Sequence, residues 1–242
     1  GGFRALSLAD GTGETNIFNA GTIKGQYAIE AGDGETNVTN RGHMKGFVNL
    51  GDGADVFDSR GGTLDGSASG QDGDDVYWFS DAGININEYS DDGFDTVKST
   101  VDYKLRDNFE TLQLLGSKAL DGKGNSADNT LLGNKGSNHL FGLGGADNLD
   151  GKAGNDLLTG GKGGDLFVFD KNADHDTVTD FHDGSDLIYS NFATNEEQIA
   201  DLLNNHVTQK GDDLLIKFGG DSLLIKGMDI DDLTEADFFA WA

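Results

Sequence analysis

Residues 124–168 read GNSADNTLL GNKGSNHLF GLGGADNLD GKAGNDLLT GGKGGDLFV, which are five consecutive nonapeptides in one register. Each nonapeptide matches most of the pattern G-G-x-G-x-D-x-U-x, where U is a large apolar residue. Position 6 of the successive units holds Asn129, Asn138, Asp147, Asp156 and Asp165. Position 8 holds Leu131, Leu140, Leu149, Leu158 and Phe167. A repeat this regular predicts a structure built by stacking one short unit on the next.

The chemistry of one unit predicts how the units stack. Glycines permit the positive φ angles of a tight turn and let carbonyl oxygens approach one another, and the short strand that follows points its large side chain inward. Stacked units therefore form a parallel β-solenoid in which position 8 fills a narrow core and the position-6 carboxylates line up along the turns. A row of like charges is repulsive unless a cation neutralises it. Ca²⁺, which takes about six to eight oxygen ligands, is suited to that role.

The composition of the whole chain excludes several classes of partner and site. Its 242 residues include 43 acidic and 17 basic ones, and the formal charge of −26 disfavours nucleic acids and anionic membranes. Cysteine is absent, which excludes disulfides, thiolate zinc sites and cysteine nucleophiles and leaves oxygen ligands. The sequence contains no run of about 18 apolar residues, so it predicts no transmembrane helix. Because the chain starts Gly1-Gly2 without Met or a signal-peptide pattern, we expect a processed product or a fragment.

These nonapeptides resemble the RTX, or haemolysin-type calcium-binding, repeats of proteins that bacteria export by type I secretion. The resemblance implies a right-handed parallel β-roll in which each Ca²⁺ is held between turns two repeats apart. Carried over to this chain, one stack of turns contains Asn129, Asp147 and Asp165, and the other contains Asn138, Asp156 and Asp174. The position-4 glycines complete the candidate ligand set, namely Gly136, Gly145, Gly154 and Gly163. Asn at position 6 departs from the pattern, so we expect the first turns to bind Ca²⁺ weakly.

The N-terminal half carries a related turn at a longer period. The five turn segments begin at Asp10, Ala31, Leu50, Gly70 and Ser90. Their position-6 residues are separated by 21, 19, 20 and 20 residues and are Thr15, Thr36, Asp55, Asp75 and Asp95. This period predicts a β-solenoid over residues 8–100 with coils of about 20 residues. We expect Ca²⁺ at the three turns with Asp at position 6 and not at the two turns with Thr.

The rest of the chain connects and closes these repeats. Alternating apolar residues over 101–123 favour strands over a loose linker and allow one continuous core. The predicted organisation is a long-period solenoid with GDG turns (1–100), connecting strands (101–123), the nonapeptide β-roll with its exit (124–192) and a C-terminal cap (193–242). In the exit, the resemblance adds further candidate calcium ligands, namely Asp174, Asp176, Asp180 and Asp186.

The cap is expected to contain a helix and a hairpin. Residues from Thr194, TNEEQIADLLNNH, predict a short capped helix. The segments DLLIKF and SLLIKG flank the turn Gly219-Gly220-Asp221 and predict a hairpin that closes the open end of the solenoid. The ending from Asp229, DIDDLTEADFFAWA, resembles the uncleaved C-terminal signals of type I secretion substrates.

No catalytic motif is found in the sequence. It lacks a P-loop, G-x-S-x-G and H-E-x-x-H, and Asp residues are too abundant to nominate a glycosidase pair. We therefore predict a non-catalytic, secreted bacterial calcium-binding module, located outside the cell or on its surface, with the type I secretion machinery as its partner. Two alternatives stay open: the calcium-binding and secretion part of a larger extracellular polysaccharide-modifying enzyme, and a self-assembling surface-layer or matrix protein. Extracellular polysaccharide and self-association accordingly stay open as partners.

Overall fold

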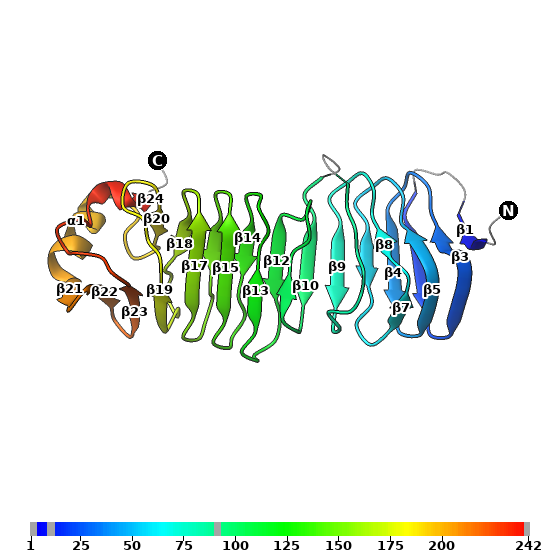
Figure 1. Ribbon diagram of the computed structural model, residues 1–242, viewed down its shortest axis with the longest axis horizontal. Coiled ribbons are helices and arrows are strands. Elements are labelled where there is room, and N and C mark those ends of the chain that lie inside the picture. The colour runs from blue at the N-terminus through cyan, green and yellow to red at the C-terminus, as the bar shows by residue number, and fades with distance from the viewer. Residues whose placement is uncertain (1–3, 9–12, 90–92, 240–242) are drawn as a thin grey trace. The chain divides into compact units, whose positions relative to one another are not determined.

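The computed structural model describes residues 4–8, 13–89 and 93–239. Parts of two predicted turns, residues 10–12 and 90–92, and the last three residues of the C-terminal segment lie outside the described residues. The chain divides into two compact units, unit 1 (Gly1–Thr111) and unit 2 (Leu112–Ala242). Each unit is built mainly of short parallel strands in successive coils, so the predicted all-β solenoid fold is confirmed (Figure 1).

Unit 1 places the strands of its coils on two sheets. The first sheet contains, in order, β1 (Arg4–Ser7), β3 (Thr22–Glu30), β5 (His43–Asn49) and β7 (Thr63–Asp65), with β8 (Ala68–Ser69) also paired to β5. The second contains β2 (Thr15–Asn19), β4 (Thr36–Asn40), β6 (Val56–Asp58), β9 (Val76–Phe79) and β10 (Thr96–Ser99). Strands β11 (Tyr103–Lys104) and β12 (Thr111–Leu114) follow, and β12 crosses the unit boundary. The pairing in the second sheet is parallel, and its register follows the predicted long period.

Unit 2 also has two sheets, now with two nonapeptides in each coil. One sheet contains, in order, β14 (Thr130–Leu132), β16 (Asn148–Asp150), β18 (Leu166–Val168), β20 (Leu187–Tyr189) and β24 (Phe238–Phe239). The other contains β13 (Asp121–Lys123), β15 (His139–Gly144), β17 (Leu157–Lys162), β19 (His175–Val178), β23 (Asp221–Ile225), β22 (Asp213–Phe218) and β21 (Val207–Lys210). Leu131 pairs with Leu149, and Leu140 pairs with Leu158, so equivalent residues stack two repeats apart.

The core of unit 2 is a column of position-8 side chains. All five are fully buried, as predicted: Leu131, Leu140, Leu149, Leu158 and Phe167. Burying a side chain of this size stabilises a fold by roughly 1.5–3 kcal/mol. The equivalent residues of four unit 1 turns are buried as well, namely Val38, Phe57, Tyr77 and Val97. The two periods therefore use the same turn, in which the residue two places after position 6 points inward.

The cap contains both predicted elements. Helix α1 (Glu196–Asn205) begins at the N-cap Asn195, whose side chain accepts a hydrogen bond from the Gln198 N–H at 3.0 Å. Strands β22 and β23 form the antiparallel hairpin, and β23 pairs in parallel with β19, so the hairpin covers the edge that the last coil would otherwise expose. A short 3₁₀ helix, η1 (Glu235–Asp237), leads into β24, which pairs with β20.

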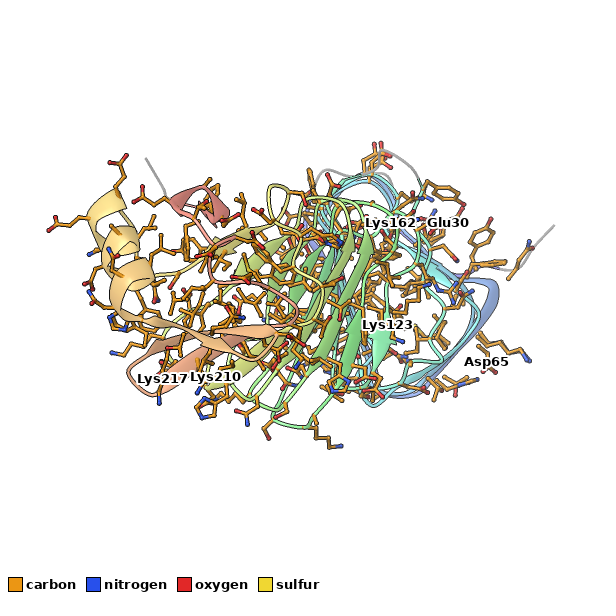
Figure 2. The ribbon with its side chains drawn as sticks, turned by 60° about the vertical axis from the view of Figure 1, so that its left-hand side comes forward. Glu30, Asp65, Lys123, Lys162, Lys210 and Lys217 are labelled. Atoms are coloured by element: carbon orange, nitrogen blue, oxygen red, sulfur yellow. The ribbon has the colours of Figure 1, made fainter. Side chains whose placement is uncertain are left out.

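Basic side chains of unit 2 lie on its surface. Lys123 is exposed on β13, with its Nζ 5.0 Å from the ring centroid of Phe141, and Lys210 and Lys217 are exposed on the β21–β22 hairpin (Figure 2).

In the described part of the chain, neither helix has the length and apolar character needed to cross a bilayer. The position-6 acids, in contrast, are buried.

Candidate metal centre

The position-6 residues form two columns in unit 2, and each column is tied together by backbone-to-carboxylate hydrogen bonds. We call them column A (Asn129, Asp147, Asp165 and Asp186) and column B (Asn138, Asp156 and Asp176). In column A, the N–H groups of Asn129, Asp147 and Asp165 donate to Oδ1 of the next Asp at 2.8, 2.9 and 3.0 Å. In column B, Asn138 and Asp156 donate in the same way at 2.7 and 2.8 Å. The ladder accounts for Oδ1 of each of these carboxylates.

The second carboxylate oxygen is left without a partner in four of these residues. Within the described residues, Oδ2 is buried and makes no hydrogen bond in Asp147, Asp156, Asp165 and Asp176. All four side chains are 1–2% exposed. Leaving a buried charged group unpaired costs several kcal/mol. These four oxygens are therefore the positions where the fold requires a cation or a proton.

Burial raises the pKa values of these four carboxyl groups. Desolvation raises the pKa of Asp147 and of Asp156 to about 7, and the pKa of Asp176 to about 8. It also raises the pKa of Asp165. Repulsion from neighbouring carboxylates adds to the shift, as between Asp147 and Asp165. Among the described residues no Lys or Arg forms a salt bridge with these four carboxylates.

Glycine is required at two positions of the turn because oxygens lie close to it. At position 1, a Cβ on Gly142 would lie 2.2 Å from Oδ2 of Asp147 and 2.5 Å from the carbonyl oxygen of Gly160. At position 4, Gly163 has φ +135°, and a Cβ there would lie 1.8 Å from the carbonyl oxygen of Gly145. The glycines thus hold carboxylate and carbonyl oxygens at the turns. The predicted position-4 glycines form two stacks, with Gly163 lying on Gly145 in one and Gly154 on Gly136 in the other.

One residue predicted for column B is not in it. The sequence period placed Asp174 after Asp156, but the N–H of Asp156 donates to Asp176, and Asp174 is exposed. The turn before β19 is two residues longer than the repeat, which moves position 6 from residue 174 to residue 176. Asp174 instead accepts a hydrogen bond from the Gly154 N–H at 3.1 Å.

Asp180 and Asp186 play different parts at the exit of the repeats. Both carboxylate oxygens of Asp180 accept backbone hydrogen bonds, from the N–H groups of Gly160 and Gly161 at 2.9 Å each. Asp186 ends column A, where its Oδ1 accepts from Asp165 and its Oδ2 from the His182 N–H at 2.8 Å. Neither residue presents a carboxylate oxygen free of hydrogen bonds, so both differ from the four Asp residues described above.

Unit 1 has a third column with the same ladder. The N–H groups of Thr36, Asp55 and Asp75 donate to Oδ1 of Asp55, Asp75 and Asp95 at 2.6, 2.7 and 2.9 Å. Oδ2 of Asp55 and of Asp75 is buried without a partner among the described residues. Burial raises the pKa of Asp75 to about 9, and the pKa values of Asp55 and Asp95 to about 7. The three Asp residues predicted from the long period therefore do stack.

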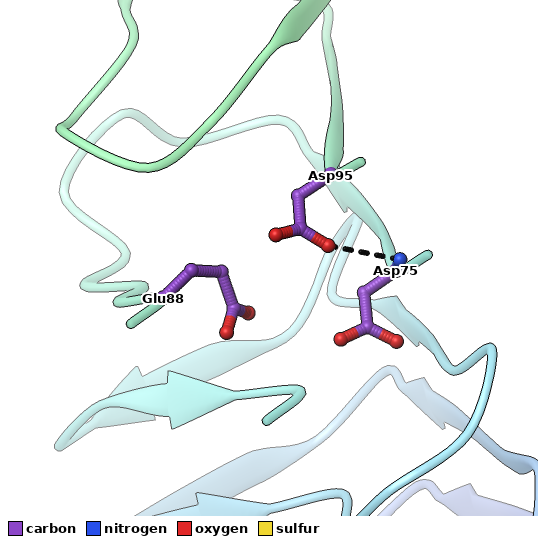
Figure 3. A group of neighbouring side chains, drawn as sticks. All are labelled: Asp75, Glu88 and Asp95. Atoms are coloured by element: carbon purple, nitrogen blue, oxygen red, sulfur yellow. Dashed lines mark hydrogen bonds between the residues drawn. The ribbon is translucent and has the colours of Figure 1, made fainter. Parts of the chain in front are cut away.

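Sequence reasoning missed one acid of this third column. Glu88 is 6% exposed, and one oxygen from each of Asp75, Glu88 and Asp95 lies within 4.8 Å of the others (Figure 3). No turn motif marks it. The alternation in Ile84-Asn85-Ile86-Asn87-Glu88 does, because Ile84 and Ile86 are buried and Glu88 is on the same face.

The donor set of columns A and B fits Ca²⁺. The available ligands are carboxylate and carbonyl oxygens, which suit a hard cation, and the columns contain no His or Cys for a transition metal. The four buried Oδ2 atoms without a hydrogen-bond partner indicate where such an ion would bind. Bound at the turns, Ca²⁺ would supply positive charge to these buried carboxylates.

The corrected column B gives a direct test. Asp176→Asn keeps the oxygen that accepts the Asp156 N–H but removes the charge, so we expect Ca²⁺ affinity in this column to fall roughly tenfold, because ligand charge sets affinity. Asp174→Asn, two residues away, is the matched control and should stay near wild type. Calorimetric Ca²⁺ titration of both variants measures the difference. A larger loss for Asp174→Asn than for Asp176→Asn would contradict the assignment.

Comparison with known proteins identifies a family for the nonapeptide region. The family model of the RTX calcium-binding nonapeptide repeat (4 copies) matches residues 123–158 and 141–176. No curated protein matches the chain. Among solved structures, the extracellular lipase LipA from Serratia marcescens matches with 18% identity and a TM-score of 0.33, over 89% of this chain and 41% of the lipase chain. The chain thus spans less than half of the lipase's length. Residues 123–176 of this chain are RTX calcium-binding nonapeptide repeats.

Proposed function

We propose that the chain is a secreted bacterial module that binds Ca²⁺, folds on it outside the cell, and has no catalytic role of its own. The observation that carries this proposal is the set of four buried, unpartnered Oδ2 atoms in columns A and B. An apo solenoid must either bury these charges or protonate them, and both oppose folding near neutral pH. Bound Ca²⁺ removes that penalty.

The difference in Ca²⁺ concentration across the cell envelope makes this a folding switch. Inside the cell, with little free Ca²⁺, the formal charge of −26 repels itself and the buried carboxylates remain uncompensated. Outside, each site stabilises the folded chain in proportion to the logarithm of the Ca²⁺ concentration relative to its Kd. The chain is thereby kept unfolded until it has been exported.

The C-terminal segment supports export in the unfolded state. In the folded chain Asp237 and Phe238 are buried, and β24 is paired with β20. A recognition signal that includes Asp237 and Phe238 is therefore fully accessible to the type I machinery only before folding, because the folded chain buries these two residues. This orders the steps as export first and Ca²⁺-dependent folding second.

Export is tested with the full chain in a bacterium carrying a type I transporter. We expect the chain in the medium only when the transporter is present, and its resistance to protease there only when the medium contains Ca²⁺. A variant without residues 229–242 should stay in the cell. The proposal fails if the chain is folded and protease-resistant in the cytosol, or if export continues without these residues.

A further inference from the structure

The acidic cluster of unit 1 is outside the nonapeptide repeats and is assembled from two different parts of the coil. Asp75 and Asp95 precede β9 and β10 in the position-6 column. Glu88 comes from the segment after β8, where the Asn87 N–H donates to the Ala68 carbonyl and the Ala68 N–H donates to the Asn85 carbonyl, at 3.0 Å each. This pairing sets Glu88 beside Gly70, whose N–H donates to Glu88 Oε1 at 2.9 Å.

The three carboxylates are directed toward one another in the interior. Figure 3 shows Glu88 facing Asp75 and Asp95 across a short gap, with Asp95 accepting the Asp75 N–H. Their exposed fractions are 0%, 6% and 1% for Asp75, Glu88 and Asp95. Ca²⁺ binds oxygens at about 2.3–2.6 Å, so two ligands of one ion are at most about 5 Å apart. The observed spread of 4.8 Å or less satisfies this limit.

A separate observation indicates that a ligand is needed here. Oδ2 of Asp75 is fully buried and has no hydrogen-bond partner among the described residues. It points toward the Gly70 corner, because a Cβ on Gly70 would lie 1.5 Å from it and 3.0 Å from the Tyr77 hydroxyl. That hydroxyl donates to Glu88 Oε1. The unpartnered oxygen thus faces the same space as Glu88, and glycine at position 70 keeps that space open.

We propose that Asp75, Glu88 and Asp95 bind a Ca²⁺-class divalent cation inside the long-period solenoid, with Glu88 as the ligand that distinguishes this site from the nonapeptide turns. The donors are three carboxylates with the Tyr77 hydroxyl beside them, which is an all-oxygen set. No Lys or Arg of the described residues forms a salt bridge with Asp75 or Asp95. The site reaches across the coil, so the ion ties a position-6 turn to the opposite strand segment.

Glu88→Gln tests the site by counting ions. Gln keeps an oxygen for the Gly70 N–H and the Tyr77 hydroxyl but removes the charge. Native mass spectrometry of the full chain in saturating Ca²⁺ should show one ion fewer than wild type. Glu35→Gln, an exposed change of the same kind in unit 1, should bind the wild-type number. Equal ion counts in all three proteins would overturn the proposal.

A second measurement applies whether or not Glu88→Gln folds. Tb³⁺ occupies oxygen-rich calcium sites and emits when a nearby tyrosine transfers its excitation. Tyr77→Phe keeps the ring but removes this donor, so sensitised emission should fall clearly below that of the control Tyr27→Phe, which alters a tyrosine packed against Phe47. Equal emission from the two variants would rule out an ion at this cluster.

The two proposals fail independently. Loss of one ion in Glu88→Gln with unchanged binding in Asp176→Asn would support the unit 1 site and count against calcium in column B. The reverse result would leave the nonapeptide sites and remove this one. Because the ion count is measured on intact chains, neither outcome depends on export.

Discussion

In a chelator at about pH 8, strands β14, β16 and β18 are expected to lose their protection against amide hydrogen exchange, and Ca²⁺ at about 10 mM should restore it. These strands follow the position-6 residues of column A. Each of these strands contributes one fully buried large side chain to the core. Without the cation, the free energy gained by burying these side chains must offset the cost of several buried, uncompensated carboxylates. We expect that it does not, and that the strands unfold.

The size of the effect follows from simple linkage. A site at ten times its Kd stabilises the folded state by about 1.4 kcal/mol, and about five such sites contribute about 7 kcal/mol. A whole domain is stable by about 5–15 kcal/mol. Removal of Ca²⁺ therefore changes the free energy of unfolding by an amount comparable with the total. We expect a cooperative transition in circular dichroism rather than a gradual loosening.

The first coils of unit 1 provide an internal control. Their position-6 residues are Thr15 and Thr36, and a neutral ladder runs through this region, in which Asn19 donates to Asn40 Oδ1 at 2.8 Å and Asn40 donates to Ser59 Oγ at 3.0 Å. Strands β2 and β4 should therefore depend less on Ca²⁺. If β2 and β4 lose protection in the chelator while β14, β16 and β18 keep it, the carboxylate columns do not control folding.

The sequence predicted most where its period was constant. Five nonapeptides in register predicted a parallel solenoid, and their resemblance to RTX repeats implied that equivalent residues stack two repeats apart, as the strand register shows. The same rule failed at the exit, where two additional residues in one turn put Asp176 in the place expected for Asp174. An irregular turn can be as compact as a regular one, and spacing alone does not show which Asp stays in register.

Glu88 illustrates a different limit. Turn motifs identify residues that act through backbone geometry, whereas Glu88 enters the cluster through strand alternation and through pairing with a segment 18 residues earlier in the chain. Alternation was visible in the sequence, but which turn the inward side chain meets depends on the register between coils. The division between Thr111 and Leu112 was also not marked, because the segment 101–123 reads as uninterrupted strands.

Lowering the pH should replace calcium, so the chelated chain is expected to be unfolded at about pH 8 and to refold toward about pH 5. Burial raises the pKa of Asp147, Asp156 and Asp176 to about 7, 7 and 8, above the ordinary value of 3.8. Because these carboxyls hold their protons more tightly in the folded chain than in the unfolded chain, protonation stabilises the folded state. This stabilisation is complete below the unfolded-chain pKa of 3.8 and is lost as the pH rises through the folded-chain values of about 7–8. With Ca²⁺ the dependence reverses, because the ion binds the deprotonated form and gains affinity as the pH rises.

Self-repulsion of a chain with a formal charge of −26 also weakens on acidification, so the source of the pH dependence needs its own control. The variant D147N/D156N/D165N/D176N replaces the four acids whose Oδ2 is buried without a partner by the amide that the chain already uses in both columns. Asn138 shows that the amide fits, because its Oδ1 accepts the Asn134 N–H at 2.7 Å and its Nδ2 donates to the Leu120 carbonyl at 3.2 Å. We expect unit 2 of this variant to stay folded in the chelator at about pH 8 and to show no response to Ca²⁺, measured by hydrogen exchange on β14–β18. An Asn variant that unfolds with the same pH midpoint as wild type would show that overall charge, and not the buried carboxylates of columns A and B, governs folding.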